Sequence, residues 1–168
     1  MAATFQWNQR TGATGVTTTS DLGSAGNLFN YQNQDVASAA QYTSYPVTAG
    51  ANSYEIWLRA HVSGTFNQIQ NIQFWKSSGT FGAGESINWH DGGIETYAAP
   101  VTTTTASTDT AIPIADPGSS NVSIGGSQAS SLSVAGYSDY ITTQMLTTTA
   151  AEAGDSEAFT FTANYDEN

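Results

Sequence analysis

The sequence contains no cysteine, which excludes disulfide bonds, thiolate metal ligands and a cysteine nucleophile. The chain must therefore hold its fold by packing alone. Its 168 residues are enough for one domain, because a folded chain of this length buries ~70% of the surface that its unfolded form exposes. Aromatic residues make up 11% of the chain, and large rings dominate the energetics of a core. We therefore expect a single domain over residues 1–168 with an aromatic core.

Basic side chains are also scarce. Only Arg10, Arg59 and Lys76 oppose 14 acidic residues, which gives a formal net charge of -11. The three lie far apart in the sequence, so we expect no basic patch. Binding to a phosphate backbone depends on clustered Lys and Arg, and so does attraction to an anionic membrane surface. The sequence therefore predicts no direct nucleic-acid binding and no membrane binding.

Long apolar runs are missing as well. The longest continuous ones are a few residues, whereas a membrane-spanning helix needs about 20. The start of the chain, MAATFQWNQR, lacks the basic region and apolar run of a secretory signal peptide. The sequence predicts neither a membrane span nor a signal peptide.

Helical periodicity is nearly absent. Only Asp35 to Gln41 is compatible with one or two helical turns, with Asp35 as the N-cap. Elsewhere, short apolar alternations recur between Gly, Pro, Asn and Asp residues, which is typical of antiparallel sheets. We therefore expect an all-β fold, an antiparallel β-sandwich or a jelly-roll-like domain with long loops rich in Thr, Gly and Ser.

The most distinctive stretch is 52–76, which holds two of the four tryptophans. Its first part alternates with the period of a strand. One predicted face, directed to the core, consists of Tyr54, Ile56, Leu58, Ala60 and Val62. The other consists of Glu55, Trp57, Arg59 and His61. Because no nucleophile, metal set or phosphate cradle converges on this second face, we regard its Glu55, Trp57 and Arg59 portion as the first candidate for contact between subunits.

Three further patterns predict strands. Ala3 to Asn8 alternates, with Phe5 and Trp7 on one side, and Phe159 to Tyr165 alternates as a half-buried strand. Tyr137 to Thr147 has large side chains on both faces, which predicts cover on both sides.

Two irregularities have a structural interpretation. Ile69 and Ile72 fall on opposite faces of their strand, and one extra residue, as in a β-bulge, would restore the phase. Asp91-Gly92-Gly93 is a turn sequence, and Ile94 to Tyr97 is the predicted returning strand of a hairpin.

The regions with the least pattern lie near the N-terminus and in the second half. Residues 1–30 are in part an extended arm, since 10–26 is rich in Gly, Thr and Ser; a surface loop is the alternative. Residues 98–136 form a long loop-rich segment that must contain edge strands of its own, around Ala111 to Ala115 and Leu132 to Val134.

Catalytic chemistry is not visible in the sequence. His90 beside Asp91 resembles a base and its orienting group, but no motif selects a nucleophile for them. We expect no catalytic residue, no metal and no cofactor. Calcium is the open alternative, although no EF-hand pattern is present. Its candidate oxygen ligands are Asp109, Asp116, Asp139, Asp155 and Glu157.

Exposed aromatic rings in a β domain also make carbohydrate binding a candidate function. Trp57, Trp75 or Trp89 would then stack against sugar rings, although tryptophans are also normal core and interface anchors. A carbohydrate-binding or receptor-binding module is therefore the alternative function.

Several segments together resemble virion structural proteins of tailed bacteriophages. The resemblance covers mainly residues 45–76 and 113–167. The segments are Ser53-Tyr54-Glu55, Trp57-Leu58-Arg59, Phe66-Asn67, Asn71 to Trp75, the DPG at 116–118, Gly136 to Tyr140 with Gln144, and Phe161 to Glu167.

This resemblance implies a non-enzymatic role as a capsid decoration or cement protein on the virion surface, assembled in the host cytoplasm. A small tail or neck component is the alternative. The implied partners are the major capsid protein or other virion proteins, and a homo-oligomer, trimer or dimer, is expected. Combined with the strand patterns, it gives these predicted interface residues: Phe5, Trp7, Glu55, Trp57, Arg59, Trp75 and Tyr140.

Overall fold

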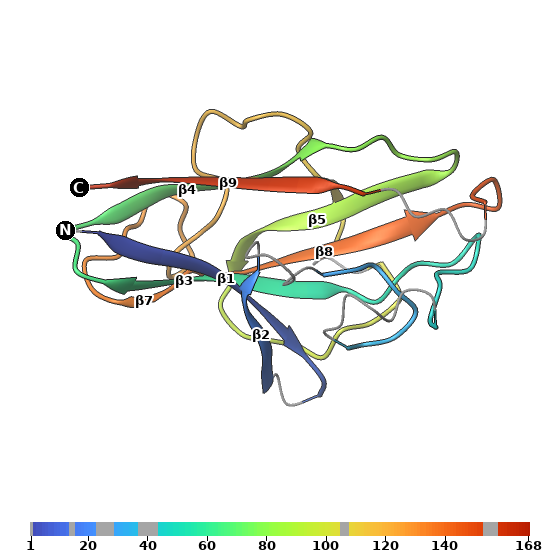
Figure 1. Cartoon of the computed structure of the whole chain (residues 1–168), viewed down its shortest axis with the longest axis horizontal. Coiled ribbons are helices and arrows are strands. Elements are labelled where there is room, and N and C mark those ends of the chain that lie inside the picture. Colours follow the sequence, from blue (N-terminus) through green and yellow to red (C-terminus); the bar gives the residue numbers. More distant parts are fainter. Residues whose placement is uncertain (1, 14–15, 23–28, 37–43, 105–107, 153–157) are drawn as a thin grey trace.

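The computed structural model describes residues 2–13, 16–22, 29–36, 44–104, 108–152 and 158–168. In this part of the chain nine β-strands form and no helix does (Figure 1). No segment of it is a helix of the length and apolarity needed to cross a bilayer. The strands are β1 Ala3–Thr11, β2 Val16–Leu22, β3 Ile56–Gly64, β4 Ile69–Ser78, β5 Glu85–Ile94, β6 Thr110–Ala111, β7 Gly136–Tyr137, β8 Tyr140–Thr147 and β9 Thr160–Glu167.

The strands form two antiparallel sheets of unequal size. The large sheet has the order β2-β1-β3-β8-β5-β6, and β7 pairs with β3 beside it. The small sheet consists of β4 and β9, which run together along one side of the large sheet (Figure 1). The predicted all-β antiparallel fold is confirmed, and the two sheets are arranged as in a β-sandwich.

Aromatic rings fill the space between the sheets, as the composition indicated. Phe5 of β1 stacks on Tyr165 of β9 with ring centroids 4.5 Å apart. Trp7 and Phe74 meet edge to face at 5.2 Å, and Phe74 also lies 6.4 Å from Trp89 of β5. Such pairs stabilise a core beyond the area that they bury. The predicted core face is confirmed from Ile56 to Val62, although Tyr54 precedes β3 and lies outside this cluster. The alternation of β9 is also confirmed, since Phe161 and its in-phase neighbours belong to the cluster.

The N-terminal segment forms a β-hairpin. β1 pairs with β3 on one side and with β2 on the other, and Thr11 lies opposite Val16 near the hairpin tip. Figure 1 shows this hairpin projecting from the edge of the large sheet. The predicted arm is therefore paired over its described part, because the Thr-rich stretch supplies β-branched residues that favour a strand.

The predicted bulge in β4 is confirmed. Gln70 lies opposite Asp166 and Gln73 opposite Asn164, so β4 has one more residue than β9 between these pairs. Asn71 takes up the extra residue with a φ of 53°, a left-handed conformation that asparagine tolerates better than most side chains. The bulge restores the phase, and both Ile69 and Ile72 are buried.

The predicted hairpin at Asp91-Gly92-Gly93 is wrong. β5 continues through these residues to Ile94, which lies opposite Tyr140 of β8, with a register shift after His90. Gly93 has a φ of 82°, which permits an irregularity as readily as a turn. The chain does not reverse because β8 offers it hydrogen-bond partners on both sides of the glycines.

Two other expectations concern less regular segments. Residues 98–136 are loop-rich as predicted; the strand-like pairs in their described part are β6, part of β7 and the bridges of Leu132 to Ile69 and of Ile124 to Ser127. This segment nevertheless closes the core, because Asn121 is hydrogen-bonded to both the N–H and the C=O of Phe74 at 2.8 and 2.9 Å. The short helix predicted over Asp35 to Gln41 lies mostly outside the described residues, and Asp35 and Val36 are not helical.

Candidate functional site: the outer face of the large sheet

The face of the large sheet that points away from the core has a defined register. Arg10 lies opposite Trp57, and Asn8 lies opposite Arg59. On the other side of β3, Trp57 lies opposite Thr142. Side chains directly opposite each other in antiparallel strands share a face. The pairing therefore brings Arg10 and Arg59, distant in sequence, onto one surface with Trp57.

Trp57 is buried on this face, with 2% of its surface exposed. Its ring packs edge to face against Tyr97 at 5.2 Å and Tyr140 at 5.7 Å. The indole N–H donates to the Oε2 atom of Glu55 at 3.1 Å, and the backbone N–H of Val101 donates to the same oxygen at 3.4 Å. The chain around Tyr97 to Val101 thus covers the end of the outer face where β3 begins.

The predicted interface residues are placed as follows. Five of the seven are buried inside the chain, namely Trp7, Glu55, Trp57, Trp75 and Tyr140. Phe5 is half-buried on the core face, where it stacks on Tyr165. Arg59 is half-buried on the outer face. Since a buried side chain offers little area to a partner, Arg59 is the member of the set from which a contact surface can be built.

The tryptophans considered for sugar stacking are also not exposed. Trp57, Trp75 and Trp89 are all buried in the chain. A ring that stacks on a sugar must present its face to solvent, so these three rings are core and cover residues here.

The exposed part of the outer face is formed by Arg10, Arg59, His61 and Tyr137, which we call the arginine patch. The Arg59 guanidinium lies over the Tyr137 ring with its Cζ atom 3.7 Å from the centroid. His61 stacks on the same tyrosine at 4.6 Å. Arg59 and Arg10 lie 5.2 and 5.8 Å from the buried ring of Tyr140. The expectation that no basic patch forms is therefore corrected, because β1–β3 pairing joins two of the three basic residues.

The positive charges of the arginine patch are in an unfavourable electrostatic environment. Burial lowers the pKa of the Arg59 guanidinium from its ordinary value, and the nearby Arg10 charge lowers it further, whereas Tyr140 and Tyr137 oppose the shift. Within the described part of the chain, neither guanidinium has a carboxylate within the 4.0 Å of an ion pair. The aromatic rings are the groups that stabilise both charges.

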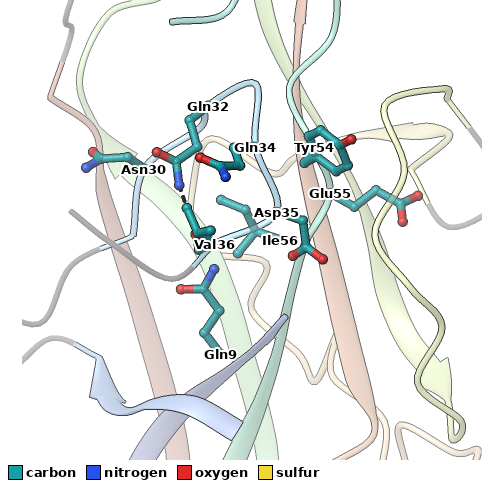
Figure 2. A pocket seen from close by; sticks show the side chains of 9 residues that line it. All are labelled: Gln9, Asn30, Gln32, Gln34, Asp35, Val36, Tyr54, Glu55 and Ile56. Atoms are coloured by element: carbon teal, nitrogen blue, oxygen red, sulfur yellow. Dashed lines mark hydrogen bonds between the residues drawn. The ribbon is translucent and has the colours of Figure 1, made fainter. Parts of the chain in front are cut away.

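Beside this face, a polar cavity of about 10 Å³ lies between β1, β3 and the loop at 30–36 (Figure 2). Gln32 is 3% exposed, and its amide N–H donates to the Val36 carbonyl at 2.8 Å. Asp35 accepts a hydrogen bond from Gly12 N–H at 2.7 Å, and burial raises the pKa of this carboxyl. A cavity of this size matches one water-sized molecule and is far below the volume of an organic ligand site. The Asp35–Gly12 hydrogen bond holds the loop against the turn between β1 and β2.

The residues considered for catalysis or calcium lie apart. His90 faces Asp109, with 3.9 Å between its Nδ1 atom and Oδ1. Both carboxylate oxygens of Asp139 accept backbone N–H groups, from Gly125 and Gly126, and Asp116 accepts from Gly118. Asp155 and Glu157 lie outside the described residues. In the described ranges, no three His, Cys, Asp or Glu side chains gather as metal ligands.

Comparisons with known proteins leave the site to be judged from its geometry. No protein-family model, no curated protein and no solved structure matches the chain.

Proposed function

We propose that this chain is a non-enzymatic virion structural protein of a tailed bacteriophage, a capsid decoration or cement protein that binds the major capsid lattice. The segments quoted above that resemble such proteins support this role. The observation that carries the proposal is the arginine patch. Arg and Tyr are enriched where protein partners bind, and here both stand at the open end of an otherwise covered face. A surface of this kind serves attachment to another protein.

The rest of the architecture supports attachment as well. A rigid sandwich keeps the patch in a fixed geometry, because Arg59 and Tyr137 are on paired strands and not on a mobile loop. The projecting β1–β2 hairpin adds an edge strand, which is a surface for pairing with a neighbour (Figure 1). Assembly into a dimer or trimer would cover such edges.

Copy number in the particle is the direct test. Quantitative mass spectrometry of purified virions should find this protein at a fixed and high ratio to the major capsid protein. A few copies per particle would favour the tail or neck alternative. Absence from purified particles would contradict the virion role.

Binding to capsids is the second test. Purified protein should bind capsids that lack it in a saturable manner, and Arg59→Gln should weaken this binding. Buried residues are poor controls, so the matched control is Asn67→Gln, a change at an exposed position outside the patch. Saturable binding of glycans in place of capsids would support the receptor-binding alternative.

A further inference from the structure

We propose that Arg10 and Arg59 together form a binding site for a carboxylate, supplied by an Asp or Glu side chain of a protein partner. The proposal deepens the attachment function, and it rests on that function only for the identity of the partner. The recognition chemistry stands on the local geometry, which is argued below.

The two guanidiniums form one site because the β1–β3 register fixes their spacing. Arg10 lies opposite Trp57, and Arg59 is two residues further along the same face of β3. Diagonal neighbours on one face of a sheet are within reach of long side chains. Both guanidinium carbons lie within 6 Å of the Tyr140 ring centroid, at 5.8 and 5.2 Å. The two guanidinium charges thus lie near one buried tyrosine ring.

The hydrogen-bonding groups of this pair are incompletely used. The Nε atom of each arginine is buried and has no hydrogen-bond partner among the described residues. The terminal nitrogens make no hydrogen bond within the described residues and are not among the buried unpaired atoms, so they remain in contact with solvent. An arginine presents several donors in a planar fork that matches the two oxygens of a carboxylate. The arrangement therefore offers donors that no acceptor of the described residues uses.

Charge makes an anionic occupant favourable. Two like charges lie near the same tyrosine ring, and Arg10 already lowers the pKa of Arg59. The chain carries 14 acidic residues, yet in its described part none is an ion-pair partner of either arginine. Removing charges from water without a counter-charge is costly. A bound carboxylate would offset that cost, whereas a neutral partner would not.

The surroundings select a compact anion over a long polyanion. The only other basic side chain, Lys76, is buried and donates to the Gly79 carbonyl. With a net charge of -11, the rest of the surface repels a nucleic acid or an anionic membrane. Tyr137, 43% exposed and stacked on both Arg59 and His61, adds aromatic area beside the charges. An acidic side chain flanked by apolar residues, as on a protein surface, fits this combination.

Nuclear magnetic resonance can test the site directly, because Arg10 and Arg59 are the only arginines in the chain. The ¹H–¹⁵N spectrum of the full-length protein should therefore contain two arginine Nε–H signals. We expect both to shift in a saturable way when N-acetyl-glutamate N-methylamide is added. N-acetyl-glutamine N-methylamide, which has the same shape without the charge, is the matched probe and should shift neither signal.

Each outcome of the titration decides the proposal. Saturable shifts of both signals with the glutamate probe alone support it. Equal shifts with both probes, or none with either into the millimolar range, overturn it. Inorganic phosphate, titrated separately, separates the ligand chemistries, and tighter binding of phosphate than of the glutamate probe would overturn the choice of a carboxylate.

Variants separate the local site from the overall charge. Arg59→Lys keeps the charge but loses the planar fork, and we expect about tenfold weaker binding of the glutamate probe. The double variant Arg59→Gln with Asn67→Lys removes one positive charge and adds another, so the net charge of the protein is unchanged. The added lysine stands at an exposed position outside the patch. Binding that persists in this double variant would overturn the site. Because these measurements use free protein and a small probe, they can fail while particle copy number still supports the virion role, and the reverse also holds.

Discussion

The two faces of the large sheet are both buried near the start of β3, but by different means. On the core face, Leu58 and Ile141 pack among apolar and aromatic side chains from both sheets. On the outer face, Trp57 is equally buried, but by tyrosines and by a carboxylate that it hydrogen-bonds. The core face is closed along its length, whereas the cover of the outer face ends before Arg59 and His61. The arginine patch, our proposed contact surface, therefore begins where the cover ends.

The strongest test of this comparison is to remove the cover residue. Trp57→Ala should lower the free energy of unfolding by about 3–5 kcal/mol, as large as a core change, because it leaves a cavity and removes a donor from Glu55. Urea unfolding followed by circular dichroism measures this. Leu58→Ala on the core face is the matched control, with an expected loss of about 2–5 kcal/mol. A loss within about 0.5 kcal/mol for Trp57→Ala would show an exposed face.

The closure of the core by the loop-rich segment is the next test. Asn121→Ala should lower the free energy of unfolding by about 1–3 kcal/mol, because two buried backbone groups of Phe74 lose their partners. Asn121→Asp keeps the acceptor for the Phe74 N–H but loses the donor to the Phe74 carbonyl. Its loss in free energy of unfolding need not fall between the wild type and Asn121→Ala. Full stability of the alanine variant would mean that this loop does not close the core.

A smaller effect concerns the pH dependence of stability at Asp35, which binds the turn between β1 and β2. Burial raises the pKa of Asp35, so the folded state binds its proton more tightly than the unfolded state does. The stabilisation by this group is complete below its unfolded pKa and is lost as pH rises through the raised pKa.

Asp35→Asn removes this titration, so the stability of the wild type relative to the variant should fall between acidic and neutral pH. The nearby ionisable groups Glu55, Tyr97 and Arg10 remain in both proteins. Urea unfolding at a series of pH values measures the difference. A difference that is constant with pH would contradict the raised pKa.

The smallest expected effect on stability lies at the open end of the outer face. Arg59→Lys should change the free energy of unfolding by about 0.5–1 kcal/mol, the range of an exposed cation–π contact. Capsid binding should respond more strongly than stability. A loss comparable with that of Trp57→Ala would place Arg59 among the cover residues instead of in a contact surface.

The core face was predictable because it depends on local periodicity. Apolar residues at every second position of β3 and β9 must share a face. The phase error between Ile69 and Ile72 predicts a bulge, which the structure places at Asn71. The turn at Asp91-Gly92-Gly93 was predicted wrongly because glycines serve a bulge as well as a reversal. Only the pairing of β5 with β8 decides between the two.

The candidate site was only half visible in the sequence. Arg59 was placed correctly on the outer face of β3, but Trp57 and Glu55 were assigned to the same exposed surface. No sequence pattern shows that Tyr97 and Val101 cover them, since these residues come from another part of the chain. Arg10 was missed because it lies in a polar segment, although its position two residues beyond Asn8 continues the alternation of the first strand.

The sequence by itself determined the all-β class, the apolar face of each long strand and the scarcity of positive charge, because these follow from composition and from a period of two residues. The tertiary structure alone decided which strands are neighbours, which outward side chains are covered and that two of the three basic residues share one face of the sheet. The reason is physical: a strand's alternation is a local property of the backbone, whereas cover and charge proximity depend on pairing between segments distant in sequence.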